Sequence, residues 1–108
     1  MPGLTPSNIA PQTLSSSPES LHSPAVERLL AAARRGQPQA YYDLGSAYSL
    51  GEGVDINLIE AHRWYNLAAL AGVQGAQEER AALAADMAPG EIAEAQRLAR
   101  EWLASLGH

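Results

Sequence analysis

Apolar residues recur at helical spacing along most of the chain after residue 24. The clearest rows are Val26, Leu29, Leu30 and Ala33; Ala61, Trp64, Tyr65, Ala68 and Ala69; and Ile92, Ala95, Ala99, Trp102, Leu103 and Leu106. Steps of three and four residues place each row on one face of a helix. Shorter rows over 38–50 and 74–86 predict two more helices. The pattern therefore predicts an all-α fold of about five helices.

Start and stop signals separate these predicted helices. Prolines suit the first helical position, where no backbone N–H is needed, and they stand at Pro24, Pro38 and Pro89. Asn57 is a good N-cap, and Glu60 three residues later completes the pattern of a capping box. Gly36 and Gly72 suit the left-handed residue that follows a helix. We therefore expect helix ends near residues 35 and 71.

Part of the chain repeats after 36 residues. The matched pairs are Ala25 with Ala61, Ala32 with Ala68, Ala33 with Ala69, Gly36 with Gly72, and Ala40 with Ala76. A period of this length is typical of stacked helical hairpins, in which each hairpin buries its apolar face on its neighbours. The repeat predicts a short α-solenoid of antiparallel helix pairs. This predicted solenoid contains one full repeat at about 37–72, a partial repeat at 25–36 and C-terminal capping helices at 73–106.

Gly45 interrupts a helical row and carries a packing prediction. Glycine inside a helix costs about 1 kcal/mol relative to alanine. Close approach of another helix would offset that cost. We expect the facing surface to be the Trp64 and Ala68 side of the third helix, so that Gly45→Leu would overpack the hairpin.

The first 24 residues differ in composition from the rest. They hold five prolines and a cluster of serines, with few apolar residues. Such a segment buries too little surface to offset its ordering entropy, which predicts a disordered Pro/Ser-rich tail at 1–24 and a helical domain at 25–108. The tail is either a solvated leader or a carrier of a linear motif or export signal.

Charge and motif content narrow the classes of function. The 108-residue chain has a formal net charge of -5 and no cysteine. An acidic chain without a basic block argues against nucleic-acid binding. No apolar run approaches the roughly 18 residues that span a bilayer, and no secretory signal stands at the N-terminus, so we expect no membrane partner and a cytoplasmic location.

His62 is the one histidine inside a predicted helix, where a surface or half-buried position is the ordinary expectation. Without a catalytic or metal-binding motif, we expect no enzyme activity, cofactor or metal.

The helical stretch 40–76 resembles the Sel1-like repeat, a relative of the tetratricopeptide repeat. The resemblance rests on the LG pair at 44–45, the GEGV loop at 51–54, and the A-x-x-W-Y-x-x-A-A spacing at 61–69. The stretch 87–102 also resembles the C-terminal cap of bacterial members. Asn57, Glu60 and Ala88 depart from the usual aspartate, lysine and threonine. The departure at Ala88 predicts a weaker start for the fifth helix.

The resemblance implies a scaffold or adaptor that binds a protein or peptide. In tetratricopeptide relatives the first helix of each pair lines the binding face. Carried onto this sequence, that face comprises Gln39, Tyr42, Ser46 and Ser49. Tyr42 would either anchor a partner or pack against the first helix. The alternative function is a self-associating structural element, which forms a weak homo-oligomer without a separate ligand.

Overall fold

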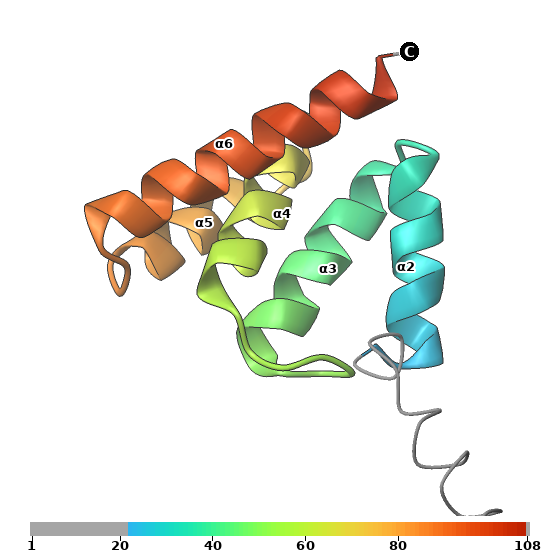
Figure 1. Cartoon of the computed structure of the whole chain (residues 1–108), viewed down its shortest axis with the longest axis horizontal. Helices are drawn as coiled ribbons and strands as arrows, with labels where there is room; N and C mark the ends of the chain where they lie inside the picture. The colour runs from blue at the N-terminus through green and yellow to red at the C-terminus, as the bar shows by residue number, and fades with distance from the viewer. Residues whose placement is uncertain (1–21, 108) are drawn as a thin grey trace, which may run out of the picture.

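A computed structural model describes residues 22–107, which form five α-helices (Figure 1). Their bounds are α2 Pro24–Arg34, α3 Pro38–Leu50, α4 Leu58–Leu70, α5 Ala76–Ala84 and α6 Pro89–Leu106. The predicted all-α solenoid of about five helices is confirmed. The proposed tail lies outside the described residues apart from its last three, and α2 begins at Pro24, one residue before the expected boundary.

Helix α4 lies at the centre of the arrangement. It packs against α3, α5 and α6, while α2 packs on the other side of α3. Successive helices alternate in direction, and α6 crosses over α4 (Figure 1). The buried side of α4 is broad because its apolar rows face three helices, and it comprises Ala61, His62, Trp64, Tyr65, Leu67 and Ala68. The hairpin of α3 and α4 is therefore the core on which the other helices pack.

Local capping sets where α2 and α4 begin. The Ser23 hydroxyl accepts a hydrogen bond from the Val26 N–H at 3.2 Å, and the Asn57 side chain accepts one from the Glu60 N–H at 3.1 Å. The reciprocal half of the predicted capping box is absent. Glu60 instead binds Arg63, and the Asn57 N–H donates to the Tyr48 carbonyl at 3.0 Å. The N-cap prediction for Asn57 is thus confirmed, whereas the prediction for the Glu60 carboxylate is wrong.

The ends of α2 and α4 have the same geometry after a shift of 36 residues. Gly36 and Gly72 both take positive φ, 75° and 84°, as expected for the residue after a helix. Four hydrogen bonds correspond: Gly36 N–H to Ala33 O at 2.8 Å and Gly72 N–H to Ala69 O at 3.0 Å, then Gln37 N–H to Ala32 O at 3.2 Å and Val73 N–H to Ala68 O at 2.9 Å. The sequence repeat is therefore a structural repeat at these turns.

The contact at Gly45 is close, but its partner differs from the predicted one. A Cβ on residue 45 would lie 2.6 Å from Cδ1 of Tyr65. The expected neighbours were Trp64 and Ala68. Adjacent helix positions point about 100° apart, as 3.6 residues per turn require. Tyr65 therefore faces Gly45, while Trp64 stacks on Tyr41 with ring centroids 6.0 Å apart.

Candidate protein-interaction surfaces

The four residues predicted to bind a partner lie along α3. Gln39 is exposed, and the other three are half-buried. Three of the four side chains already form hydrogen bonds within the chain. Gln39 Nε2 donates to Asp43 Oδ1 at 3.0 Å, the Ser46 and Tyr65 hydroxyls share a hydrogen bond of 3.0 Å, and Ser49 Oγ donates to the Ser46 carbonyl at 3.1 Å. This α3 face is therefore held in place by its own hydrogen bonds.

Tyr42 packs toward α4 and α5. Its ring meets the ring of Tyr65 edge-on, with centroids 5.3 Å apart and an interplanar angle of 69°. Its hydroxyl oxygen lies 3.9 Å from the position of a Cβ on Gly75, at the start of α5. Burial raises the pKa of the Tyr42 hydroxyl, and the carboxylate of Glu79 raises it further. The ring is thus a rigid, half-buried, neutral group beside negative charge.

A second surface is a groove of about 510 Å³ between α2, α4 and α6. We call it the tryptophan groove. Its lining includes Leu30 and Arg34 of α2, Tyr48 of α3, Glu60, Arg63 and Trp64 of α4, and Trp102 of α6; residues 54–57 and His22 lie at one end. Burial raises the pKa of the Tyr48 hydroxyl, and Glu60 adds to the effect. The lining of the groove thus includes aromatic rings together with charged groups of both signs.

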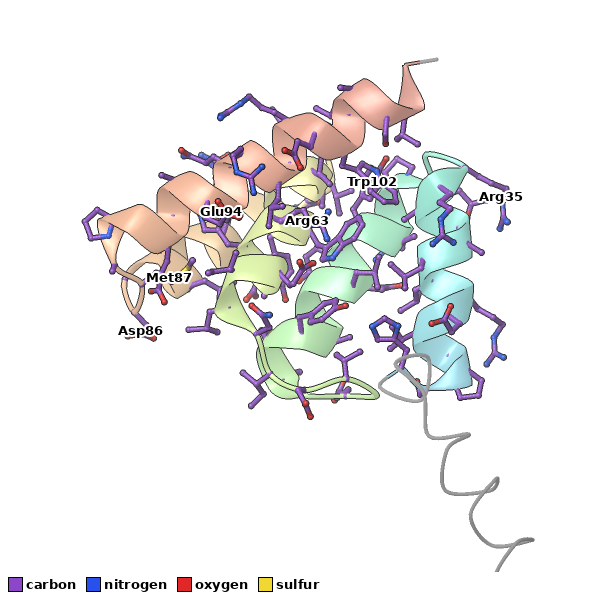
Figure 2. All side chains as sticks on the ribbon, in the orientation of Figure 1. Arg35, Arg63, Asp86, Met87, Glu94 and Trp102 are labelled. Carbon is purple, nitrogen blue, oxygen red and sulfur yellow. The ribbon has the colours of Figure 1, made fainter. Side chains whose placement is uncertain are left out.

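Aromatic contacts fix the inner wall of the tryptophan groove. The rings of Trp64 and Trp102 meet edge-on with centroids 4.8 Å apart. The Arg63 guanidinium lies over both rings, with its central carbon 4.5 Å from the Trp64 centroid and 5.9 Å from that of Trp102. Figure 2 shows Arg63 on α4 near Trp102 on α6. Glu60 holds the guanidinium through a 2.5 Å ion pair. Cation–π attraction and this ion pair together restrict Arg63 and Trp102.

Sequence reasoning placed Trp64 and Trp102 on apolar faces, but it did not predict the tryptophan groove. One signal was available, because each tryptophan lies in the second helix after a repeat turn, α4 after Gly36 and α6 after Gly72. Their approach depends on the crossing of α6 over α4, which helical periodicity does not specify. Trp102 Nε1 also lies 3.4 Å from the Tyr41 hydroxyl, a long hydrogen bond between residues 61 positions apart.

His62 is more buried than the sequence indicated. Only 3% of its surface is exposed, and its Nδ1 has no hydrogen-bond partner among residues 22–107. Burial lowers the pKa of the imidazole, and the nearby charge of Arg80 lowers it further. Arg80 itself donates to Asn66 Oδ1 at 2.5 Å. The position favours a neutral imidazole between α4 and α5, which is a structural role.

The fold and its repeated helix turns define a short all-α helical-repeat structure. No family model matches the chain, and no solved structure matches it. Over 67 residues, or 62% of its length, the chain is 40% identical to the alginate biosynthesis protein AlgK of Azotobacter vinelandii. AlgK contains Sel1/tetratricopeptide-type repeats, and the chain spans 15% of its length. The similarity agrees with a helical-repeat architecture.

Among residues 22–107, no helix combines the length and apolar character needed to cross a bilayer. In the same range, no three histidine or acidic side chains converge in a way that could hold a metal ion.

Proposed function

We propose that the chain is a protein-interaction module of the Sel1-like kind that its motifs resemble, and that it binds a peptide or protein surface without catalysis. The equivalent turns at Gly36 and Gly72 support the repeat assignment. The partial similarity to AlgK supports it independently. A cytoplasmic location is part of the proposal, and cell fractionation tests it.

The observation that carries the proposal is the state of Tyr42 on the α3 face. A binding anchor is most effective when its ring is held before the partner arrives, because less rotamer entropy is then lost. The edge contact with Tyr65 holds the Tyr42 ring, which remains partly exposed. Gln39, Ser46 and Ser49 supply polar atoms along the same helix. Tyrosine is also enriched among residues that dominate interface energetics.

The test is affinity capture with three forms of the full chain. Tyr42→Ala should lose a partner that wild type retains, and purified partner should then bind the variant at least about tenfold more weakly, as for loss of an anchor worth more than about 1.4 kcal/mol. Tyr48→Ala is the matched control because it removes a half-buried tyrosine from a different side of α3. Circular dichroism confirms that each variant is folded. If every partner survives Tyr42→Ala, the α3 face is not the binding site.

Self-association is the second candidate, and an exposed leucine on α6, the last helix of the array, favours it. Leu103 is 45% exposed. Apolar side chains at the ends of a repeat array can stack on another copy. Light scattering over a range of concentrations tests this candidate, with Leu103→Ser as the variant. A monomer at every concentration rejects it.

A further inference from the structure

The tryptophan groove is separate from the α3 face and points to an occupant of its own. Its partly exposed apolar lining includes Leu30, Tyr48 and Trp102. Trp64 is buried beneath them and supports the ring of Trp102. Arg34 is exposed at the end of α2 and has no ion-pair partner within residues 22–107. Aromatic-lined grooves accept proline-rich segments, because the flat pyrrolidine ring packs on an aromatic face at low entropy cost. The matching occupant is proline-containing and aliphatic, with negative charge opposite Arg34.

The first residues that the structure describes lie at this groove. His22 is one of its lining residues. The Ser23 N–H donates to the Gly53 carbonyl at 2.8 Å. A Cβ on residue 53 would lie only 2.4 Å from the Ser23 hydroxyl oxygen, so the Ser23 side chain packs against Gly53 where a larger residue would clash. This contact fixes the point from which residues 1–21 extend, at the end of the groove formed by residues 54–57.

We propose that residues 1–21 bind in the tryptophan groove of their own chain. The segment contains four prolines and four aliphatic side chains that match the aromatic lining: Pro2, Pro6, Pro11 and Pro18, and Leu4, Ile9, Leu14 and Leu21. Its only charged side chain is Glu19, which complements Arg34. The other arginine of the groove, Arg63, is already paired with Glu60. The proposal concerns a surface other than the α3 face and does not depend on the proposed function.

The length of the segment is sufficient for this contact. Helix α2 has 11 residues and is therefore about 16 Å long, at roughly 1.5 Å per residue. An extended chain covers up to about 3.3 Å per residue, so five or six residues before His22 can run the length of α2. A segment attached at the groove also has an effective concentration in the millimolar range, so weak contacts suffice for binding. Attachment favours this occupant over the same segment of a second copy.

A spin-label experiment on the full chain tests the proposal. Because the chain has no cysteine, Ser15→Cys provides a single site for a nitroxide. Binding in the groove should broaden the NMR signals of Leu30, Arg34 and the Trp102 indole N–H. Signals of Gln39 and Tyr42 on the α3 face should broaden much less. Leu14→Asp combined with Pro18→Gly should remove the selective broadening, because both changes oppose packing on aromatic rings.

Two arginines at the end of α2 provide a matched pair of groove variants. Arg34 lines the groove, whereas its exposed neighbour Arg35 does not. Arg34→Glu should lower the ratio of bound to free segment roughly two- to five-fold, as for loss of a surface charge pair. Arg35→Glu should leave the ratio unchanged. Equal effects of the two variants would show that no charge contact forms inside the groove and would contradict the proposal.

The pattern of NMR broadening decides whether residues 1–21 bind in the groove. Broadening that is absent, or equal on the groove and the α3 face, overturns the proposal. The bound segment could come from the same chain or from a second copy. A mixture of spin-labelled chain and isotope-labelled chain without the nitroxide separates these two sources. Broadening that appears in this mixture shows binding between copies and overturns binding within one chain. Broadening confined to chains that carry both labels supports it.

Discussion

The ring of Tyr65 lies directly against the backbone of Gly45. Three ring atoms, Cδ1, Cε1 and Cγ, would lie 2.6–2.8 Å from a Cβ on residue 45. The ring cannot easily move away, because Tyr42 contacts it edge-on and Ser46 binds its hydroxyl. Glycine at this position therefore allows α3 and α4 to approach at the centre of the hairpin.

Gly45→Ala should destabilise the fold despite the better helix propensity of alanine. Propensity favours alanine by about 1 kcal/mol, whereas overpacking costs about 1–3 kcal/mol and should be greater here because the ring is fixed on two sides. We expect a net loss in the free energy of unfolding, measured by urea denaturation. Gly90→Ala is the control, since a Cβ at Gly90 in α6 meets no atom within 4 Å. It should leave stability unchanged or raise it. Equal effects of the two substitutions would contradict close packing at Gly45.

The hydrogen bond between Ser46 and Tyr65 should contribute measurably to stability. It is 3.0 Å long, partly buried, and joins residues of α3 and α4. Tyr65→Phe removes the hydroxyl and keeps the ring against Gly45, so the expected loss is about 0.5–1.5 kcal/mol. Ser46→Ala provides the second arm of a double-mutant cycle. Additive losses in the double variant would show that the two hydroxyls do not interact.

The start of α6 should be open to stabilisation. Its N-cap is Ala88, which has extended φ and ψ but no side-chain acceptor. One half of a capping box is present, because the Glu91 carboxylate accepts from the Ala88 N–H at 2.8 Å. Ala88→Ser would supply the acceptor for the other half and should raise the free energy of unfolding by about 0.5–2 kcal/mol.

The control for this change is the same substitution inside α6. Ala104 is exposed in the last turn of α6, far from the N-cap, and serine is a poorer helix former than alanine. Ala104→Ser should therefore lower stability slightly. Thermal unfolding followed by circular dichroism compares the two variants. A gain at both positions, or at neither, would show that capping is not the cause.

Features that depend on neighbouring residues were predictable from the sequence. Asn57 caps α4 through its own side chain, and Gly36 and Gly72 end helices by taking positive φ. These interactions span a few residues, so local sequence determines them. The ring that covers Gly45 was not predictable. Trp64 and Tyr65 both belong to the apolar row of α4, and the angle at which α3 and α4 cross decides which of them faces residue 45.

The α3 face and the tryptophan groove also differ in how far the sequence predicts them. The α3 face follows from helical spacing, and Gln39, Tyr42, Ser46 and Ser49 do lie along one helix, although their role as binding residues stays a prediction. The tryptophan groove depends on α2 and α6, which are far apart in sequence. Its inner wall requires the Arg63 guanidinium to lie over the rings of Trp64 and Trp102. No spacing rule connects these three positions, because two of them meet the third only after α6 has packed on α4.

His62 should make the fold sensitive to acid. Burial and the charge of Arg80 lower the pKa of this imidazole in the folded state below its ordinary value of 6.5. The unfolded chain then binds more protons than the folded one below that pH. The free energy of unfolding is therefore at its full value above about pH 6.5, where His62 is neutral in both states. It decreases as pH falls from there through the lowered pKa of the folded state. The melting temperature should therefore fall on acidification, and His62→Gln should reduce the dependence. His22→Gln is the control because His22 is more exposed and lies beside Glu27. A melting temperature whose dependence on pH is the same in wild type and His62→Gln would show that the buried imidazole is not the cause.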